Sequence, residues 1–165
     1  MSNKTEPREP VMIPFSLSGL VEEVLGRAAE EAGNRGVELG SEIDPAMPER
    51  LIGDPAGLQQ VVGNLIENAI RFTEKGGIQL KIERASIPSS DTCEVEFSVS
   101  DTGVGIPEEM LRGIFKDGQV GSGLVTAKAQ VEAMGGVIWA ESRPGQGSRF
   151  HFRMVIRQEL RHQSS

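Results

Sequence analysis

Residues 54–77 have the sequence DPAGLQQVVGNLIENAIRFTEKGG, which is the most regular stretch of the chain. Its apolar residues keep helical spacing for roughly three turns, which predicts an amphipathic helix. Asp54 is a favourable N-cap residue, and Pro55 suits the first helical position. The pair Gly76-Gly77 is expected to end the helix. The predicted buried face consists of Leu58, Val61, Val62, Leu65, Ile66, Ala69 and Ile70.

A polar stripe runs beside this apolar face. Asn64, Glu67, Asn68 and Arg71 follow one another at spacings of three, one and three residues, so their side chains share one side of the helix. The simplest interpretation is a face in contact with solvent. However, asparagine is a mediocre residue inside a helix. Two carboxamides and a cation can also bind a hard metal ion and phosphate oxygens. The stripe alone leaves both interpretations open.

Two glycine-rich segments lie further along the chain. Asp101-Thr102-Gly103-Val104-Gly105 follows a predicted strand. A carboxylate there can accept a hydrogen bond from an exocyclic amine, and the glycines let the backbone approach a flat ring. Gly121-Ser122-Gly123 opens a predicted helix, whose free amides and positive dipole end favour an anion. A tight turn is the alternative for each segment, because a lone Gly-x-Gly is weak evidence.

The rest of the chain mixes strand and helix patterns. Helical spacing begins near Ser16 or Ser18 and stops at Gly33 and Gly36. A short helix is expected to open at Pro107. Strands are predicted over residues 37–43, 78–84, 94–100, 137–141 and 148–156. The fold class is therefore an α/β (α+β) two-layer sandwich, in which a mixed sheet of about five strands has helices packed on one face.

Residues 15–156 are expected to form one domain of this 165-residue chain. Residues 1–14 are predicted to be a flexible leader, because three prolines (Pro7, Pro10 and Pro14) interrupt any regular element. Residues 157–165 are predicted to be a polar tail that frays.

Composition excludes several functional classes. The net charge of -7 argues against broad binding to nucleic acid or anionic lipid. No apolar run approaches the ~18 residues of a membrane span. From the charge and the apolar pattern together, we expect no direct contact with nucleic acid or membrane. The single cysteine, Cys93, excludes an internal disulfide framework and fits a reducing compartment.

Together, the order and spacing of these motifs resemble the ATP-binding catalytic domain of sensor histidine kinases. This domain belongs to the superfamily shared with DNA gyrase, the ninety-kilodalton heat-shock chaperone and mismatch-repair MutL. The similar segments are residues 64–73 (N box), 101–106 (first glycine box), 114–115 (start of the F box), 121–124 (start of the second glycine box), and 132–136 and 144–148 (closing segment). The resemblance implies a Bergerat-type sandwich that binds ATP or ADP with Mg²⁺.

The resemblance also implies roles for single residues. Asn68 would ligate Mg²⁺, and Asn64 and Arg71 would act as catalytic residues, at the phosphates and on the triphosphate charge respectively. Asp101 would accept a hydrogen bond from the adenine amino group, in a pocket shaped by Gly103 and Gly105. The other nucleotide contacts implied are Phe72 beside the adenine or ribose, backbone groups of Gly121 and Gly123 at the phosphates, and Ile106, Ser122 and Leu124.

The residue at position 64 bears on the reaction type. ATPases of the superfamily place a glutamate one turn before the metal asparagine, as the base for an attacking water. Asn64 stands there, so efficient hydrolysis is not expected. A histidine kinase needs no such base, because the acceptor imidazole is itself the nucleophile. We interpret Glu67 as a solvated acid rather than a base.

The phosphoacceptor histidine is not identifiable in this sequence. His151 and His162 are the only histidines, and neither has the following acid and downstream proline of the family's acceptor helix. Both are expected at the surface. The implied partner is a dimerisation and phosphoacceptor domain of the same kinase, and indirectly a response regulator. The isolated domain is expected to be a cytoplasmic monomer without turnover, although its parent protein can be membrane-anchored.

The lid segment leaves an alternative open. Only Lys116–Val120 separates Phe115 from Gly121, where relatives have a longer mobile loop, and Val125 stands at the family's next glycine. Either change can weaken ATP retention, because lids sequester the reaction. The short lid is either natural or engineered. The second hypothesis is a degenerate, nucleotide-poor module that acts through protein–protein contact, and Asn64 disfavours a third, a stand-alone ATPase.

Overall fold

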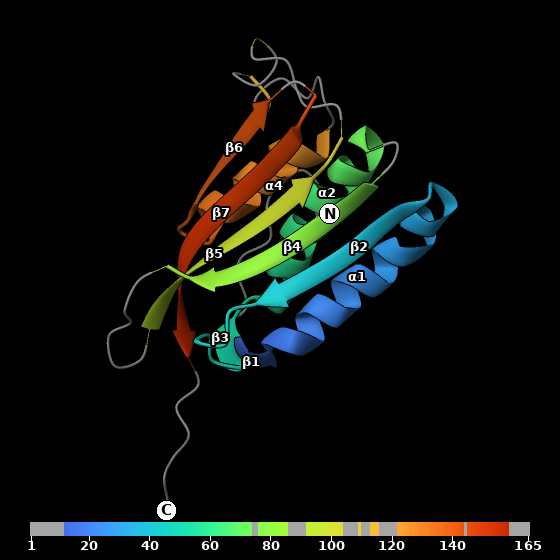
Figure 1. Ribbon diagram of the computed structural model, residues 1–165. Coiled ribbons are helices and arrows are strands. Elements are labelled where there is room, and N and C mark those ends of the chain that lie inside the picture. Colours follow the sequence, from blue (N-terminus) through green and yellow to red (C-terminus); the bar gives the residue numbers. More distant parts are fainter. Residues whose placement is uncertain are drawn as a thin grey trace, which may run out of the picture.

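A seven-stranded mixed sheet with helices on one face forms the framework of the molecule (Figure 1). The computed structural model describes residues 12–73, 76–85, 92–103, 109, 113–115, 122–143 and 145–158. The strands are β1 (Ile13–Ser16), β2 (Val37–Ile43), β3 (Arg50–Gly53), β4 (Gly76–Arg84), β5 (Thr92–Asp101), β6 (Val137–Arg143) and β7 (Gly147–Gln158). The helices among the described residues are α1 (Leu17–Asn34), α2 (Pro55–Phe72) and α4 (Ser122–Ala133).

The strand order is β1-β3-β7-β5-β4-β2, with β6 also paired to β7. Strands β2 and β4 run parallel, and the other pairs are antiparallel. The long strand β7 pairs with β6 through Gly147–Arg153 and with β3 through Arg157 and Gln158. Both β6 and β3 therefore pair with the edge of β7 that is opposite β5.

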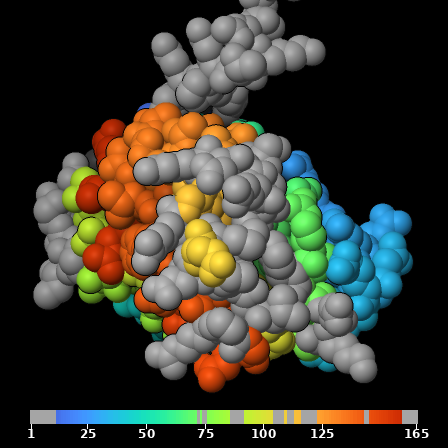
Figure 2. All heavy atoms as spheres, turned by 90° about the horizontal axis from the view of Figure 1, so that it is seen from above, coloured from blue at the N-terminus to red at the C-terminus, as the bar shows by residue number. Residues whose placement is uncertain are grey.

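The core lies between the sheet and the helices. Alternate residues of β5 and β7 face the helices, and the rings of Phe97 and Phe152 stack with centroids 4.6 Å apart. Helix α2 contacts both α1 and α4. In Figure 2 the orange atoms of α4 and β6 lie on the opposite side of the molecule from the blue atoms of α1. The predicted sheet with helices on one face is confirmed.

The central helix begins as the sequence predicts but ends earlier. The Asp54 side chain accepts a hydrogen bond from the Gly57 amide, as an N-cap does. Helix α2 ends at Phe72, and the hydroxyl of Thr73 donates to the Ala69 carbonyl at 2.8 Å. The prediction that Gly76-Gly77 ends the helix was wrong, because both glycines already belong to strand β4.

Two short strands, β1 and β3, were missed, so the prediction of about five strands was too low. They pair with each other, and β1 also includes Pro14, which was assigned to a flexible leader. A proline is tolerated there because β1 is the edge strand of the sheet. Residues 1–11 and the end of the predicted tail from residue 159 lie outside the described residues.

Candidate functional site

The polar stripe of α2 faces a cavity of about 330 Å³ between α2 and α4. Asn64, Asn68 and Arg71 line it from α2, and Gly123 and Leu124 line it from the start of α4. The structure thus brings together five residues that the sequence analysis selected from two separate motifs. Gln60, Glu67 and Thr126 complete the described lining.

Asn68 is the unusual residue of this cavity. Its side chain is 3% exposed, and neither its amide nitrogen nor its amide oxygen has a hydrogen-bond partner among the described residues. A buried amide without partners costs free energy, so such a group calls for an explanation. An amide oxygen is a hard ligand that suits Mg²⁺. Asn68 therefore fits the metal role that the family resemblance implies.

Asn64 has a partner within the protein. Its side-chain nitrogen donates to the carbonyl of Gly123 at 3.2 Å, which ties the middle of α2 to the first turn of α4. This contact holds Gly123, one of the glycines that were expected at the phosphates. Arg71 is exposed in the last turn of α2, and Glu67 is also exposed, as the solvated interpretation expected.

Within the described residues, no group of three or more His, Cys, Asp or Glu side chains is arranged to hold a metal ion.

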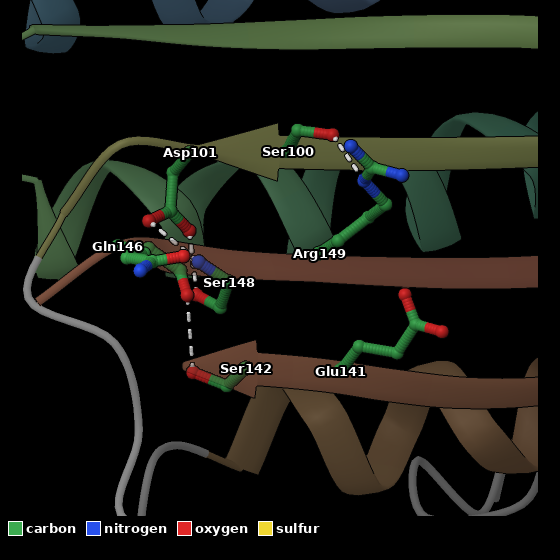
Figure 3. Close-up of a pocket in the computed structure, with 8 residues that line it drawn as sticks. Ser100, Asp101, Glu141, Ser142, Gln146, Ser148 and Arg149 are labelled. Carbon is green, nitrogen blue, oxygen red and sulfur yellow. Dashed lines mark hydrogen bonds between the residues drawn. The ribbon is translucent and has the colours of Figure 1, made fainter. Parts of the chain in front are cut away.

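Asp101 lies at the end of β5, and its carboxylate is held firmly (Figure 3). It is 5% exposed, and Oδ1 accepts from the amides of Gly103 at 2.9 Å and Ser148 at 3.3 Å. The Ser148 hydroxyl donates to Oδ2 at 2.8 Å. Asp101 does not belong to the described lining of the α2–α4 cavity. No role was predicted for Ser148, although it lies in residues 144–148, which resemble the closing segment of the family.

Gly147 explains why the hairpin between β6 and β7 can approach Asp101 so closely. Its φ is +98°, and an added Cβ would lie 2.0 Å from the carbonyl oxygen of Asp101. Only glycine fits a position with both constraints. The same hairpin borders a cavity of about 360 Å³ at the ends of β5, β6 and β7, which Asp101, Ser142 and Ser148 help to line (Figure 3).

Several predicted residues cannot be placed in the site. Gly105, Ile106 and Gly121 lie outside the described residues, as do the lid Lys116–Val120 and the helix start at Pro107. Phe72 is the last residue of α2, and Ser122 is the first of α4. Val125, which stands at the family's next glycine, is 37% exposed and is not in the described lining of the cavity.

His151 is not a surface residue, so that prediction was wrong. It is 7% exposed, and its ring nitrogens face Glu96 and Glu141. Strand alternation does place it on the outward face, but neighbouring side chains cover it there. His162 lies outside the described residues. No helix in the described part of the chain is long and apolar enough to cross a membrane.

Comparison with known proteins agrees with this geometry. Residues 53–158 match the family model of histidine kinase-, DNA gyrase B-, and HSP90-like ATPases. The signal transduction histidine-protein kinase BarA of Escherichia coli is 36% identical over 156 residues, covering 87% of this chain and 17% of BarA. This chain therefore spans less than a fifth of that relative's length.

Solved structures show the same fold. Full-length ShkA in complex with AMPPNP matches with a TM-score of 0.81 at 27% identity, covering 96% of this chain and 34% of ShkA. The catalytic domain of histidine kinase ThkA matches with a TM-score of 0.73 at 29% identity, covering 87% of this chain and 96% of that domain. The chain thus belongs to the family of histidine kinase-, DNA gyrase B- and HSP90-like ATPases.

Proposed function

We propose that this domain binds Mg·ATP and donates the γ-phosphoryl group to a histidine on a separate domain of its parent kinase. The observation behind this proposal is the buried side chain of Asn68, whose two amide atoms have no described partner in the α2–α4 cavity. The polar surroundings of that cavity suit a phosphate chain and a hard cation.

Each residue of the cavity has a separate task. Asn68 would hold Mg²⁺ through its amide oxygen, and the bound cation supplies neutralisation of phosphate charge. Arg71 adds a positive charge at the mouth of the cavity. Asn64 holds the first turn of α4 through Gly123, so the backbone amides of that turn can bind phosphate oxygens. Outside the described lining of this cavity, Asp101 would accept a hydrogen bond from the adenine amino group.

The residues at positions 64 and 67 favour transfer of the γ-phosphoryl group to an imidazole over its transfer to water. Asn64 replaces the base that would activate water, and Glu67 is exposed. His151 cannot serve as the acceptor, because both ring nitrogens already face carboxylates in the sheet. An acceptor histidine on another domain agrees with the much greater length of relatives such as BarA. The alternative is a degenerate module that acts through protein–protein contact. No described feature favours it, because Val125 does not belong to the described lining of the cavity.

Calorimetric titration with a non-hydrolysable ATP analogue tests the proposal. We expect binding that requires Mg²⁺, and a loss of about tenfold to a hundredfold in affinity in Asn68→Ala. Asn34→Ala is the matched control, because Asn34 is an exposed asparagine at the end of α1. Absence of binding in the wild-type protein at millimolar analogue, or equal affinity in both variants, would contradict the proposal.

Phosphate release distinguishes the reaction types. With ATP and Mg²⁺, the isolated domain should release no inorganic phosphate above background, since it has neither an acceptor nor a base for water. Steady release proportional to protein concentration would instead identify a stand-alone ATPase.

A further inference from the structure

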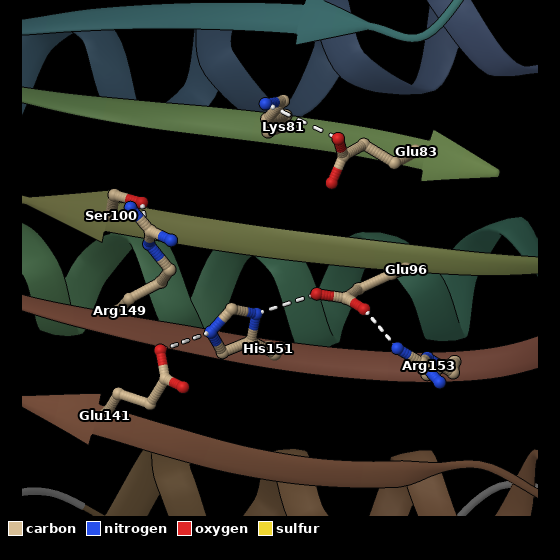
Figure 4. Close-up of polar contacts among 8 residues, drawn as sticks. All are labelled: Lys81, Glu83, Glu96, Ser100, Glu141, Arg149, His151 and Arg153. Atoms are coloured by element: carbon tan, nitrogen blue, oxygen red, sulfur yellow. Dashed lines mark hydrogen bonds and ion pairs between the residues drawn. The ribbon is translucent and has the colours of Figure 1, made fainter. Parts of the chain in front are cut away.

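The sheet face turned away from the helices contains a buried histidine that connects three strands (Figure 4). His151 of β7 lies between two carboxylates, Glu96 of β5 and Glu141 of β6. Nδ1 is 2.9 Å from an oxygen of Glu96, and Nε2 is 3.2 Å from an oxygen of Glu141. The Glu96 side chain is 17% exposed, whereas that of Glu141 is 65% exposed.

The ring of Trp139 covers this histidine, and Arg153 contacts both Trp139 and Glu96. Trp139 of β6 stacks on the imidazole at a centroid distance of 4.9 Å and an interplanar angle of 7°. Arg153 donates to Glu96 at 2.7 Å and lies 5.7 Å from the centroid of the Trp139 ring. Because Trp139 is the only tryptophan of the chain, its fluorescence reports on this cluster alone.

The other charged groups on this face have neighbours of their own. Arg149 of β7 donates to Ser100 of β5 at 3.0 Å. On β4, Lys81 pairs with Glu83 at 3.4 Å. On β5, Glu94 is the remaining carboxylate, and it lies near enough to Arg153 to attract it. The direct ionisable neighbours of the His151 ring nitrogens among the described residues are therefore Glu96 and Glu141.

Glu96 keeps its negative charge over a wide pH range. Burial disfavours the ionised form, but hydrogen bonds from Arg153 and His151 outweigh this cost and lower the pKa of Glu96 below its usual value. The carboxylate is therefore charged throughout the pH range in which an imidazole changes its protonation.

The number of protons on the imidazole decides which contacts it makes. Only the protonated ring has an N–H on each nitrogen, so only this form can donate to both carboxylates. A neutral ring has one N–H, and it is best used on the more buried carboxylate, Glu96, which is costlier to leave unpaired. Loss of the second proton therefore releases Glu141, which is the hydrogen-bond contact of the ring to strand β6.

Strand β6 leads from this contact to the candidate nucleotide site. Glu141 is followed by Ser142, whose hydroxyl donates to the carbonyl of Gly147 at 3.2 Å. Gly147 is followed by Ser148, which donates to the Asp101 carboxylate through both its amide and its hydroxyl (Figure 3). The route from His151 to Asp101 thus consists of hydrogen bonds and adjacent residues of one hairpin.

We propose that His151 is a positioning residue whose protonated ring holds the β6–β7 hairpin in the arrangement that orients Asp101 through Ser148. Deprotonation frees Glu141, loosens the hairpin and weakens the hold of Ser148 on Asp101. The consequence for nucleotide affinity rests on the proposed function, whereas the coupling between His151 and Ser148 does not.

Nuclear magnetic resonance tests the coupling without any nucleotide. Over a pH titration, the amide resonances of Ser148 and Gly103 should move with the same midpoint as the ring protons of His151 and the Trp139 fluorescence. His151→Gln should abolish the movement, and His162→Gln should keep it because His151 is unchanged. Ser148 and Gly103 resonances that stay constant while His151 titrates would overturn the proposal.

A second variant separates the charge effect from simple loss of structure. In Glu141→Gln, the side-chain amide can donate to the neutral ring, so the Ser148 resonance should respond to pH much less while the domain stays folded. An unchanged Ser148 titration in this variant would contradict the route through Glu141.

Nucleotide affinity measured over the same pH range gives the functional readout. With ADP and Mg²⁺, we expect affinity to fall about threefold to tenfold as pH rises in the wild type, beyond the titration of the phosphates themselves. His151→Gln should show only the phosphate effect. Equal pH dependence in both proteins would overturn the positioning role. Absence of ADP binding at every pH would contradict the proposed function, and the Ser148 titration would still decide the coupling.

Discussion

Asn68 of α2 and His151 of β7 are both buried polar residues, and they lie on opposite sides of the sheet. Asn68, on the helix side, has no described hydrogen-bond partner for either amide atom. His151 lies on the sheet face turned away from the helices, here called the open face. It has a carboxylate at each ring nitrogen and an aromatic ring stacked on it. The difference separates two reasons for burying a polar group. The partnered ring organises the protein itself, whereas the unpartnered amide is suited to a ligand.

The largest loss of stability is expected for a substitution of Gly147, where the β6–β7 hairpin contacts Asp101. Gly147→Ala should destabilise the domain by about 3 kcal/mol or more, because the Cβ would overlap the Asp101 carbonyl at a positive φ. Gly145→Ala is the matched control, since its φ is +79° but no atom lies within 4 Å of the added Cβ. We expect about 1 kcal/mol there. Equal losses in urea denaturation would show that the close approach is unimportant.

The next effect compares the two faces directly. His151→Ala should lower the free energy of unfolding by about 2 kcal/mol, because Glu96, whose side chain is 17% exposed, loses a donor. Asn68→Ala should leave stability unchanged or raise it, since an amide without described partners is removed. Urea denaturation of both variants checks this contrast. A large loss of unfolding free energy in Asn68→Ala would mean that this amide stabilises the fold.

A smaller effect concerns two glycines of α2, the helix that positions Asn68. Gly63→Ala should stabilise the domain by about 0.5–1 kcal/mol, because nothing lies near the added Cβ and alanine favours helix. Gly57→Ala should not share this gain. Its Cβ would lie 2.5 Å from Asp54 Oδ2 and 2.8 Å from Gln130 Nε2, and both side chains are buried. Thermal denaturation compares the pair, and equal gains would contradict the packing described.

The smallest expected effect is a pH dependence of the free energy of unfolding that arises from Glu96 on the open face. The pKa of Glu96 is lowered in the folded protein, since the bonds from Arg153 and His151 outweigh its burial. Its contribution to stability is therefore present above its unfolded pKa and is lost as the pH falls through the folded value. Between pH 6 and about pH 3, wild-type stability should fall more steeply than that of Glu96→Gln. Parallel curves in urea denaturation would show that Glu96 contributes nothing to this loss.

The helix-side features were predictable from local sequence. The spacing of apolar residues and the Asp54 cap identified α2, and the polar stripe identified the residues that line the cavity. The end of α2 was misplaced because Thr73 stops the helix before the glycines do. The roles of the stripe toward nucleotide and metal remain predictions.

The open face and the sheet edge were less predictable, because they depend on contacts distant in sequence. Strands β1 and β3 have four residues each, too few for a period, and β3 pairs with β7 across about a hundred residues. His151 was predicted at the surface, and the alternation of β7 cannot tell that Trp139 and Glu96 cover its ring. The role of Ser148 likewise depends on its register opposite Asp101.

The most direct test is a crystal structure with AMPPNP and Mn²⁺ in place of Mg²⁺, located by anomalous scattering. We predict that the metal lies about 2.0–2.2 Å from the amide oxygen of Asn68, that the phosphates lie in the α2–α4 cavity, and that the adenine amino group donates to Asp101. A nucleotide bound with its metal away from Asn68 would contradict the account.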